Sequence, residues 1–281
     1  ARLENRIGQY RERYFNPDKR SRDQIFSYAP REGADEEIRD KISDICISMK
    51  AEDYLQLPER IVVDAPVQLD KRAAALYAKM EREAILQIDD QLIDAGTAAA
   101  LGGKLLQLCN GAVYDADRQV VPVHDCKLEA FMELVEGLGG AHALVFYSYR
   151  HDLDRLQKAL RPSGLRVRVL QTDQDVVDWN AGRVDLLLSH PGSSAYGINL
   201  QAGGHHIIWF GLPWALELYQ QANARLWRQG QPEAVIIHRL TVVGGHDEDV
   251  IAALAAKEGA QEALLQGLKA RIDRVRKESE A

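Results

Sequence analysis

Short apolar segments alternate with helical segments along the second half of the chain, and this alternation limits the possible folds. Strands that alternate with helices predict a parallel sheet covered on both faces. The crossover rule then brings the carboxyl ends of the strands to one edge. The sequence therefore predicts an α/β fold with candidate functional residues in the loops at that edge. The expected strands are 142–147, 166–170, 185–189, 206–210 and 235–242, and the expected helices are 127–138, 151–160, 174–181, 215–228 and 247–256.

Composition places the chain among ordinary globular proteins. Its 281 residues can bury a substantial core, and 46% apolar with 27% charged residues is typical of that class. The net charge of −7 argues against a dedicated basic DNA-binding domain, although a groove needs only local positive charge. Cys46, Cys109 and Cys126 show no Cys-x-x-Cys spacing, which favours structural thiols in a reducing compartment and hence a cytoplasmic location.

Two arginines stand three residues apart in the segment 221–231, Gln-Ala-Asn-Ala-Arg-Leu-Trp-Arg-Gln-Gly-Gln. On a helix, Arg225 and Arg228 would point from the same face, with Gln221 one turn earlier. The arginine side chain binds phosphate through a planar, permanently charged guanidinium. Such a pair can neutralise charge on a transferring phosphoryl group. Two arginines alone would also be explained by a helix face that is exposed to solvent.

The segments upstream of these arginines carry a family resemblance. Residues 189–200 follow an apolar run and resemble the fifth motif of the Swi/Snf-type helicase-like ATPases of superfamily two, while 221–231 resembles their sixth motif. Residues 143–149 resemble the fourth motif, and 54–60 the end of the first lobe. The resemblance implies a RecA-like, P-loop-NTPase-type sheet and the C-terminal, second lobe of a DNA-dependent ATPase that typically translocates along double-stranded DNA.

Several positions depart from the family pattern. Ala224 replaces the usual acid before the first arginine, Gln229 replaces an isoleucine, and Pro213-Trp214-Ala215-Leu216 replaces Asp-Trp-Asn-Pro. These departures indicate a divergent branch, of phage or prophage kind, but they leave both arginines in place.

The resemblance also implies roles for individual residues. Arg225 and Arg228 would be arginine fingers in catalysis. Gly197, Asn199 and Gln221 would face the nucleotide, with Gly197 allowing close backbone approach. Contacts with the DNA backbone would come from Ser148, Tyr149 and Ser189.

The phosphate-binding half of such an ATPase is missing from this sequence. Gly102-Gly103-Lys104 is followed by Leu105 rather than Ser or Thr, so it is not a phosphate loop. Asp247-Glu248 is separated from its strand and is better explained as acids in the first turn of a helix. ATP and Mg²⁺ would therefore be bound mainly by a first lobe, which would be the partner of this chain. We expect a fragment of a longer protein that is inactive when isolated.

The first part of the chain is expected to differ from the α/β part. We predict a mainly helical N-terminal region over 1–126, the RecA-like lobe over 127–260, and a helical tail over 261–281. Helices are expected over 70–92 and 98–109. A strand at 61–69 is expected to complete the first lobe's sheet, so without that lobe its edge would be an association hazard.

Two other functions are compatible with parts of the sequence. One is a DNA- or protein-binding module that uses a RecA-like scaffold without a motor. The other is a dinucleotide enzyme, against which the lack of Gly-x-Gly-x-x-Gly argues. Trp214 could stack on a ligand or pack in the core. No metal site is predicted, because His205 and His206 are adjacent strand residues that should point to opposite faces.

Overall fold

The computed structural model describes residues 3, 6–18, 28–42, 57–86, 95–193, 198–256 and 260–280. The chain divides into two compact units, Ala1–Leu55 and Gln56–Ala281. The predicted borders at residues 126 and 260 fall inside the second unit. No helix in the described ranges combines the length and the apolar character that a membrane span requires.

In its described residues, the first unit contains two helices and one antiparallel pair of short strands. α1 (Ile7–Tyr14) leads into β1 (Phe15–Pro17), which pairs antiparallel with β2 (Tyr28–Pro30), and α2 (Ala34–Ile42) follows. Tyr14 is buried, and its hydroxyl accepts a hydrogen bond of 2.9 Å from Lys41 Nζ. Of the basic cluster seen in the sequence, Lys19, Arg20 and Arg22 lie outside the described residues.

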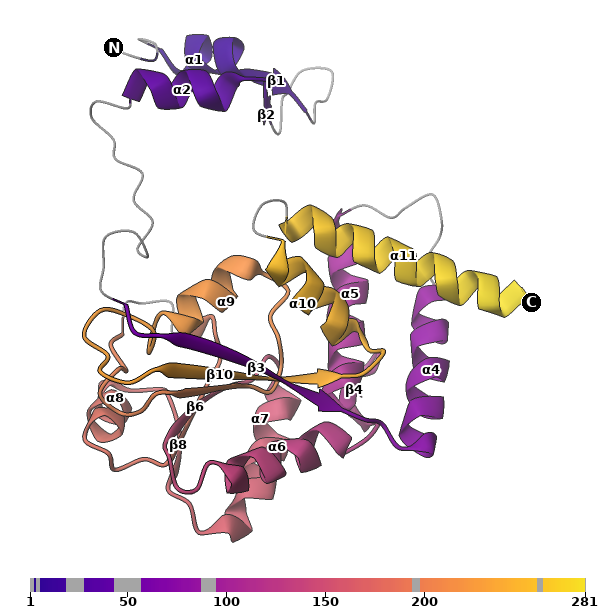
Figure 1. Cartoon of the computed structure of the whole chain (residues 1–281). Helices are drawn as coiled ribbons and strands as arrows, with labels where there is room; N and C mark the ends of the chain where they lie inside the picture. Colours follow the sequence, from indigo (N-terminus) through magenta and orange to yellow (C-terminus); the bar gives the residue numbers. More distant parts are fainter. Residues whose placement is uncertain are drawn as a thin grey trace. The chain divides into compact units, whose positions relative to one another are not determined.

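The second unit is built on a six-stranded sheet with strand order β3-β10-β9-β6-β8-β7 (Figure 1). All five pairings are parallel, which confirms the predicted sheet. β6, β7, β8 and β9 are only three or four residues long, whereas β3 and β10 have eight residues each. Their bounds are β3 (Arg60–Val67), β6 (Ala143–Phe146), β7 (Val167–Val169), β8 (Leu186–Ser189), β9 (His206–Trp209) and β10 (Val235–Val242).

Each face of the sheet carries its own hydrophobic core. Alternate strand residues such as Val145 and Leu144 point to opposite faces, as the pleat requires. One core includes Phe131 of α6 and Leu156 of α7, whereas the other includes Trp179 of α8 and residues of α9 and α10. The helix bounds are α6 (Cys126–Gly137), α7 (Arg150–Leu160), α8 (Asp173–Asn180), α9 (Leu216–Asn223) and α10 (His246–Ala255).

β3 belongs to this sheet, and the expectation that it needs the first lobe's sheet is wrong. It pairs with β10 over its whole length, from Arg60 opposite Val235 to Val67 opposite Val242. The bidentate ion pair between Arg239 and Asp64, at 2.6 and 2.8 Å, ties the two strands further. β3 therefore forms the outer edge of the second unit's own sheet (Figure 1).

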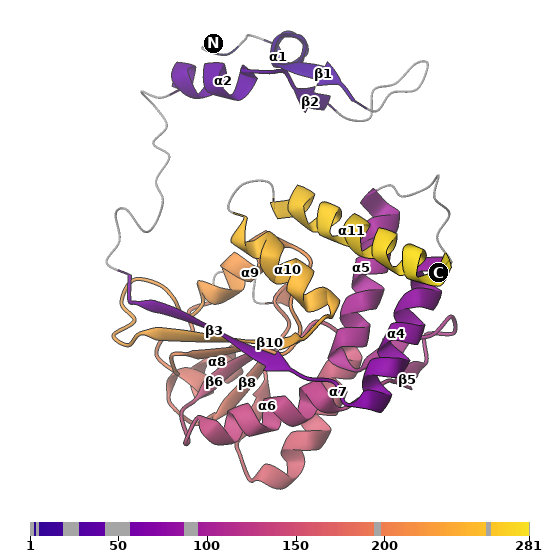
Figure 2. The same cartoon turned by 45° about the vertical axis from the view of Figure 1, so that its right-hand side comes forward.

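Helices outside the alternation pack at one end of the sheet. α4 (Lys71–Leu86) and α5 (Ala95–Asn110) contact each other, and α11 (Ala260–Glu280) lies across them and α10 (Figure 2). Arg271 of α11 fixes this arrangement, because it pairs with Glu81 of α4 at 2.8 Å and Asp249 of α10 at 2.6 Å. A hairpin of β4 (Ala112–Tyr114) and β5 (Val120–Pro122) follows α5.

Two adjacent glycines in α5 should respond in opposite ways to alanine. A Cβ on Gly102 would lie 2.0 Å from Cζ3 of the Trp214 ring, whereas one on Gly103 meets nothing nearer than Tyr149 Oη at 4.0 Å. We expect Gly102→Ala to lower the free energy of unfolding by about 1–3 kcal/mol through overpacking. Gly103→Ala should raise it by up to about 1 kcal/mol, since alanine favours helix.

Urea denaturation of both variants tests this prediction. If Gly102→Ala is as stable as the wild type, the Trp214 ring does not rest on α5 as described.

Candidate functional site

The loops that follow the strands gather at the carboxyl edge of the sheet, as parallel topology dictates. Ser148 and Tyr149 follow β6, and Ser189 ends β8. Gly211 follows β9 and lies beside the end of β6, because the Ser148 hydroxyl donates to its carbonyl oxygen at 3.0 Å. The three loops therefore lie close together.

The two arginines do not share a helical face, and that part of the prediction is wrong. α9 ends at Asn223, and Arg225 and Arg228 lie in the turns that follow it. Tertiary contacts explain the early end of the helix. The Asn223 side chain accepts a hydrogen bond of 2.9 Å from Trp209 Nε1, and Trp227 Nε1 donates to Pro58 O at 2.9 Å.

Arg225 is nearly buried and has few partners. It is 8% exposed, its NH1 donates to Ile198 O at 3.4 Å, and its Nε has no hydrogen-bond partner among the residues that the structure describes. Within the described residues, neither Arg225 nor Arg228 forms an ion pair. Burial, and next the charge of Arg228, hold the pKa of Arg225 below its usual value. Two like charges therefore lie close together without a carboxylate between them.

The segment after β8 lies directly against this arginine turn. The backbone N–H of Leu200 donates to Arg225 O at 3.3 Å, so both the side chain and the backbone of Arg225 bind residues that flank Asn199. Asn199 is exposed, and its Oδ1 accepts from the backbone N–H of Gln201 at 3.2 Å. Gln221 is exposed on α9, and Gly197 lies outside the described residues.

The predicted DNA-contacting side chains point largely inward. Ser189 is fully buried, and its hydroxyl lies 3.3 Å from His190 O. The Tyr149 hydroxyl donates to Gly103 O at 2.9 Å, and burial raises its pKa. Ser148 is half-buried, with its hydroxyl bonded to Gly211 O. That these hydroxyls contact a DNA phosphate stays a prediction. Their internal hydrogen bonds do not support it, because each hydroxyl already donates within the protein.

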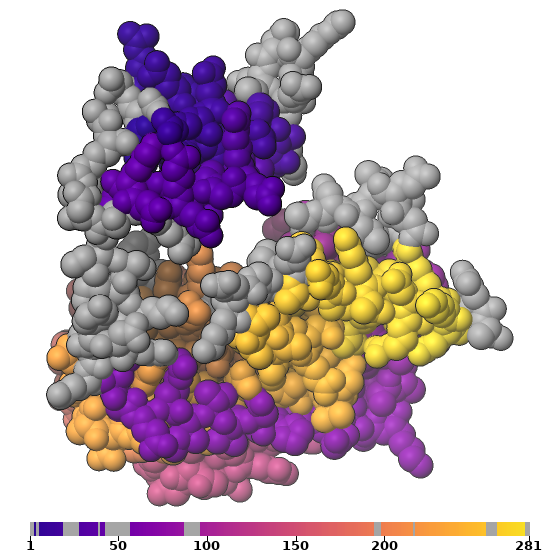
Figure 3. Space-filling view, turned by 45° about the horizontal axis from the view of Figure 1, so that its top comes forward, coloured from indigo at the N-terminus to yellow at the C-terminus, as the bar shows by residue number. Residues whose placement is uncertain are grey.

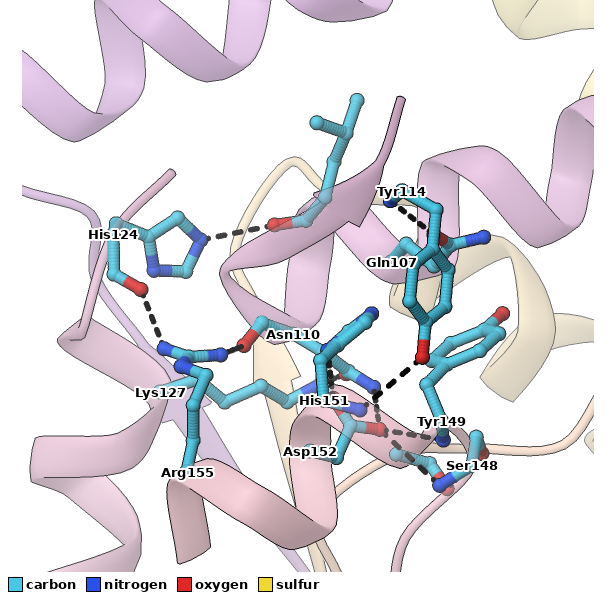
Figure 4. Close-up of polar contacts among 12 residues, drawn as sticks. Gln107, Asn110, Tyr114, His124, Lys127, Ser148, Tyr149, His151, Asp152 and Arg155 are labelled. Carbon is cyan, nitrogen blue, oxygen red and sulfur yellow. Dashed lines mark hydrogen bonds and ion pairs between the residues drawn. The ribbon is translucent and has the colours of Figure 1, made fainter. Parts of the chain in front are cut away.

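A buried polar network under this edge was missed from the sequence (Figure 4). Lys127 Nζ lies 2.7 Å from Asp247 Oδ2, with both side chains fully buried, and donates to Asn110 Oδ1 at 2.9 Å. Asn110 Nδ2 in turn donates to Asp152 Oδ2 at 2.9 Å. The network thus joins α5, α6, α7 and α10 beneath the loops.

Asp152 connects this network to the turn after β6. Its Oδ2 accepts hydrogen bonds from the backbone N–H groups of Ser148 at 3.2 Å and Tyr149 at 2.9 Å, so it caps α7 (Figure 4). The spacing Tyr149-x-x-Asp152 before an apolar helix is a signal that could have revealed this cap. Lys127 offered no signal, because an isolated lysine in a helix is usually solvated.

Two segments resemble phosphate- or metal-binding motifs only in part, and the structure shows that each has another role. Gly102 and Gly103 lie inside α5, and Lys104 Nζ donates to Tyr114 O at 2.7 Å, so this segment does not form a phosphate loop. Asp247 and Glu248 occupy the first turn of α10, as predicted. In the described ranges, no group of three or more His, Cys, Asp or Glu side chains is placed to hold a metal.

His206 of the adjacent histidine pair contacts a third histidine, His238. His206 Nδ1 lies 3.2 Å from His238 Nε2, so one ring donates a hydrogen bond to the other. Burial, and next the neighbouring histidines, lower the pKa of His206 to about 4. The His206 ring is therefore neutral at neutral pH.

Comparison with known proteins identifies relatives in sequence. No family model matches the chain. It is 36% identical over 234 residues to putative protein p41 of Acyrthosiphon pisum secondary endosymbiont phage 1, covering 81% of this chain and 50% of p41. It is 23% identical over 227 residues to the putative ATP-dependent helicase/translocase YwqA of Bacillus subtilis, covering 75% of this chain and 24% of YwqA. The chain thus spans half or less of these relatives.

Solved structures show the same architecture. The C-terminal part of the Fun30 ATPase domain matches with a TM-score of 0.57 at 15% identity, over 80% of this chain and 99% of that one. The predicted resemblance to the C-terminal part of Swi/Snf-type ATPase cores is confirmed at the level of the fold. The Sulfolobus solfataricus SWI2/SNF2 ATPase core in complex with dsDNA also matches, with a TM-score of 0.55 at 21% identity, over 85% of this chain and 54% of that one. The predicted RecA-like fold is confirmed, and we refer to residues 56–281 as the RecA-like unit.

Proposed function

We propose that the RecA-like unit is the second motor lobe of a Swi/Snf-type, DNA-dependent ATPase and translocase. The observation that carries this proposal is the pair Arg225 and Arg228, which have no ion-pair partner among the described residues. A nearly buried guanidinium without a counter-charge is costly to a fold. A bound anion removes that cost, and Nε of Arg225 has no hydrogen-bond partner in the described part of the chain.

The anion in this proposal is the phosphate chain of ATP held by a first lobe with Mg²⁺. Closure of the lobes would place the two guanidinium groups on the γ-phosphoryl group, where such residues accelerate transfer by about 10³–10⁵. Asn199 and Gln221 are both exposed and would contact the nucleotide or the first lobe. We propose that Gly197, in the segment that follows β8, allows the backbone to approach the nucleotide closely.

The DNA strand would lie along the loops after β6 and β8. A solved core of this fold is a complex with dsDNA, which supports this part of the proposal. Because Ser148, Tyr149 and Ser189 are engaged internally, we assign them to shaping these loops. Exposed neighbours would touch the phosphates: Arg150, whose side chain is 71% exposed, and Ser193.

A steady-state phosphate-release assay tests whether ATP hydrolysis requires the first lobe in addition to this chain. The chain alone, with ATP, Mg²⁺ and duplex DNA, should show only background turnover, because nothing recognised in it holds the β- and γ-phosphates. When joined to the first lobe, whether encoded upstream in the same reading frame or added as a separate chain, it should hydrolyse ATP with stimulation by DNA. Brisk turnover by the chain alone that disappears in Arg228→Ala would overturn the proposal.

A further inference from the structure

The outer edge of β3 is long, apolar and open. Ile61, Val62 and Val63 are 38%, 43% and 40% exposed, which places them among the large apolar side chains most open to solvent in the described part of the chain. The strand forms part of the surface of the RecA-like unit in Figure 3. No strand of the described ranges pairs with this side of β3. Edges of this kind readily pair with another strand.

The hydrogen-bond pattern fixes which backbone groups face outward. The N–H groups of Val235 and Val243 donate to the carbonyl oxygens of Glu59 and Val67, so the odd-numbered residues of β3 face β10. Residues alternate along a strand, and the backbone groups of 60, 62 and 64 therefore point away from β10. Pro66 carries no N–H, so a ladder on this side ends before it.

The three outward-facing residues of β3, at positions 60, 62 and 64, can pair with the same three residues of a second copy. In an antiparallel pair with Val62 on a two-fold axis, Val62 faces its own copy and Arg60 faces Asp64 of the other chain. All three outward residues would then occupy hydrogen-bonded pairs, in which N–H and C=O groups are exchanged. Opposite charges directly across such a pair are stabilising.

The acidic partner has room for a second arginine. Asp64 accepts two hydrogen bonds from Arg239, yet its side chain stays 51% exposed. A carboxylate offers about four acceptor sites, so an arginine from another chain can bind beside Arg239. The parallel alternative would place like residues side by side and lacks this charge match.

We propose that β3 is a self-association surface, through which two copies of the chain join their sheets antiparallel about Val62. The contact continues the six-stranded sheet of one copy into that of the other. It is independent of the proposed ATPase function, since Arg225 and Arg228 lie outside β3.

Sedimentation velocity over a concentration series tests the surface. The wild-type chain should form a dimer, and Val62→Lys should weaken it at least about tenfold, because two like charges then meet on the axis. Val177→Lys is the matched control, since Val177 is 53% exposed on α8 and should leave the dimer unchanged. A wild-type chain that stays monomeric, or a dimer that Val62→Lys does not weaken, would overturn the proposal.

A charge-reversal experiment tests the register. Arg60→Glu alone places Glu opposite Asp64, and Asp64→Arg alone places Arg opposite Arg60, so each variant should be monomeric. Their equimolar mixture should recover a heterodimer, because both cross-strand pairs become attractive again. Circular dichroism of each variant verifies that the sheet is intact. If the folded variants stay monomeric when mixed, the antiparallel register about Val62 is wrong.

Discussion

Lys127→Ala should lower the free energy of unfolding by about 3–5 kcal/mol, because it leaves buried carboxylates without their counter-charge. Lys127 is fully buried, and its ammonium group contacts Asp247 at 2.7 Å and Asn110 at 2.9 Å. Through Asn110 the loss also reaches Asp152, which caps α7. Urea denaturation monitored by tryptophan fluorescence measures the change.

Two further variants make this test specific. Lys158→Ala removes an exposed lysine from α7 and should change stability by less than about 0.5 kcal/mol. The double variant Lys127→Met/Asp247→Leu should lower the free energy of unfolding by clearly less than the sum of the losses in the two single variants. The reason is that it removes both members of the ion pair together. A loss below about 1 kcal/mol for Lys127→Ala would show that the network is not formed in solution.

The α/β architecture was predictable because its signals are local. Buried parallel strands are apolar runs, and Gly or Pro punctuates them, so 235–242 coincides with β10 and 127–138 differs from α6 by one residue at each end. The resemblance of the sequence motifs to those of Swi/Snf-type ATPases predicted which loops follow which strands. Neither kind of signal depends on which distant segment a residue contacts.

The partners of distant segments were not predictable from local signals. The sequence of β3 does not specify which sheet it joins, and its partner β10 lies far along the chain. The end of α9 at Asn223 depends on Trp209 and Pro58, which are equally remote in sequence. In the same way, Lys127 is buried only because Asp247 and Asn110 come from other helices.

Arg228→Ala should lower the rate of DNA-stimulated ATP hydrolysis by about 10³-fold or more in the two-lobe protein that we propose. The guanidinium group would act only when charge develops on the transferring phosphoryl group, so kcat should fall while KM for ATP changes little. Arg225→Ala should have a similar effect, and the double variant should be only slightly worse, because both arginines serve one phosphate site.

Two comparisons separate catalysis from general charge loss. Arg183→Ala removes an arginine that is 55% exposed and paired with Asp178, and it should leave the rate within about twofold. Arg228→Lys keeps the charge but loses the planar fork, and it should recover only part of the rate. Equal DNA affinity among all variants would show that binding of the strand is not what the substitutions impair.

The most direct measurement is kcat for phosphate release by the two-lobe protein at saturating ATP and duplex DNA, for wild type and Arg228→Ala. If Arg228 acts on the transferring phosphoryl group, kcat of Arg228→Ala should fall by about 10³-fold or more with the fold and DNA affinity unchanged. A folded Arg228→Ala protein that retains at least about one tenth of the wild-type rate would contradict this role, because these arginines would then not complete the phosphate site.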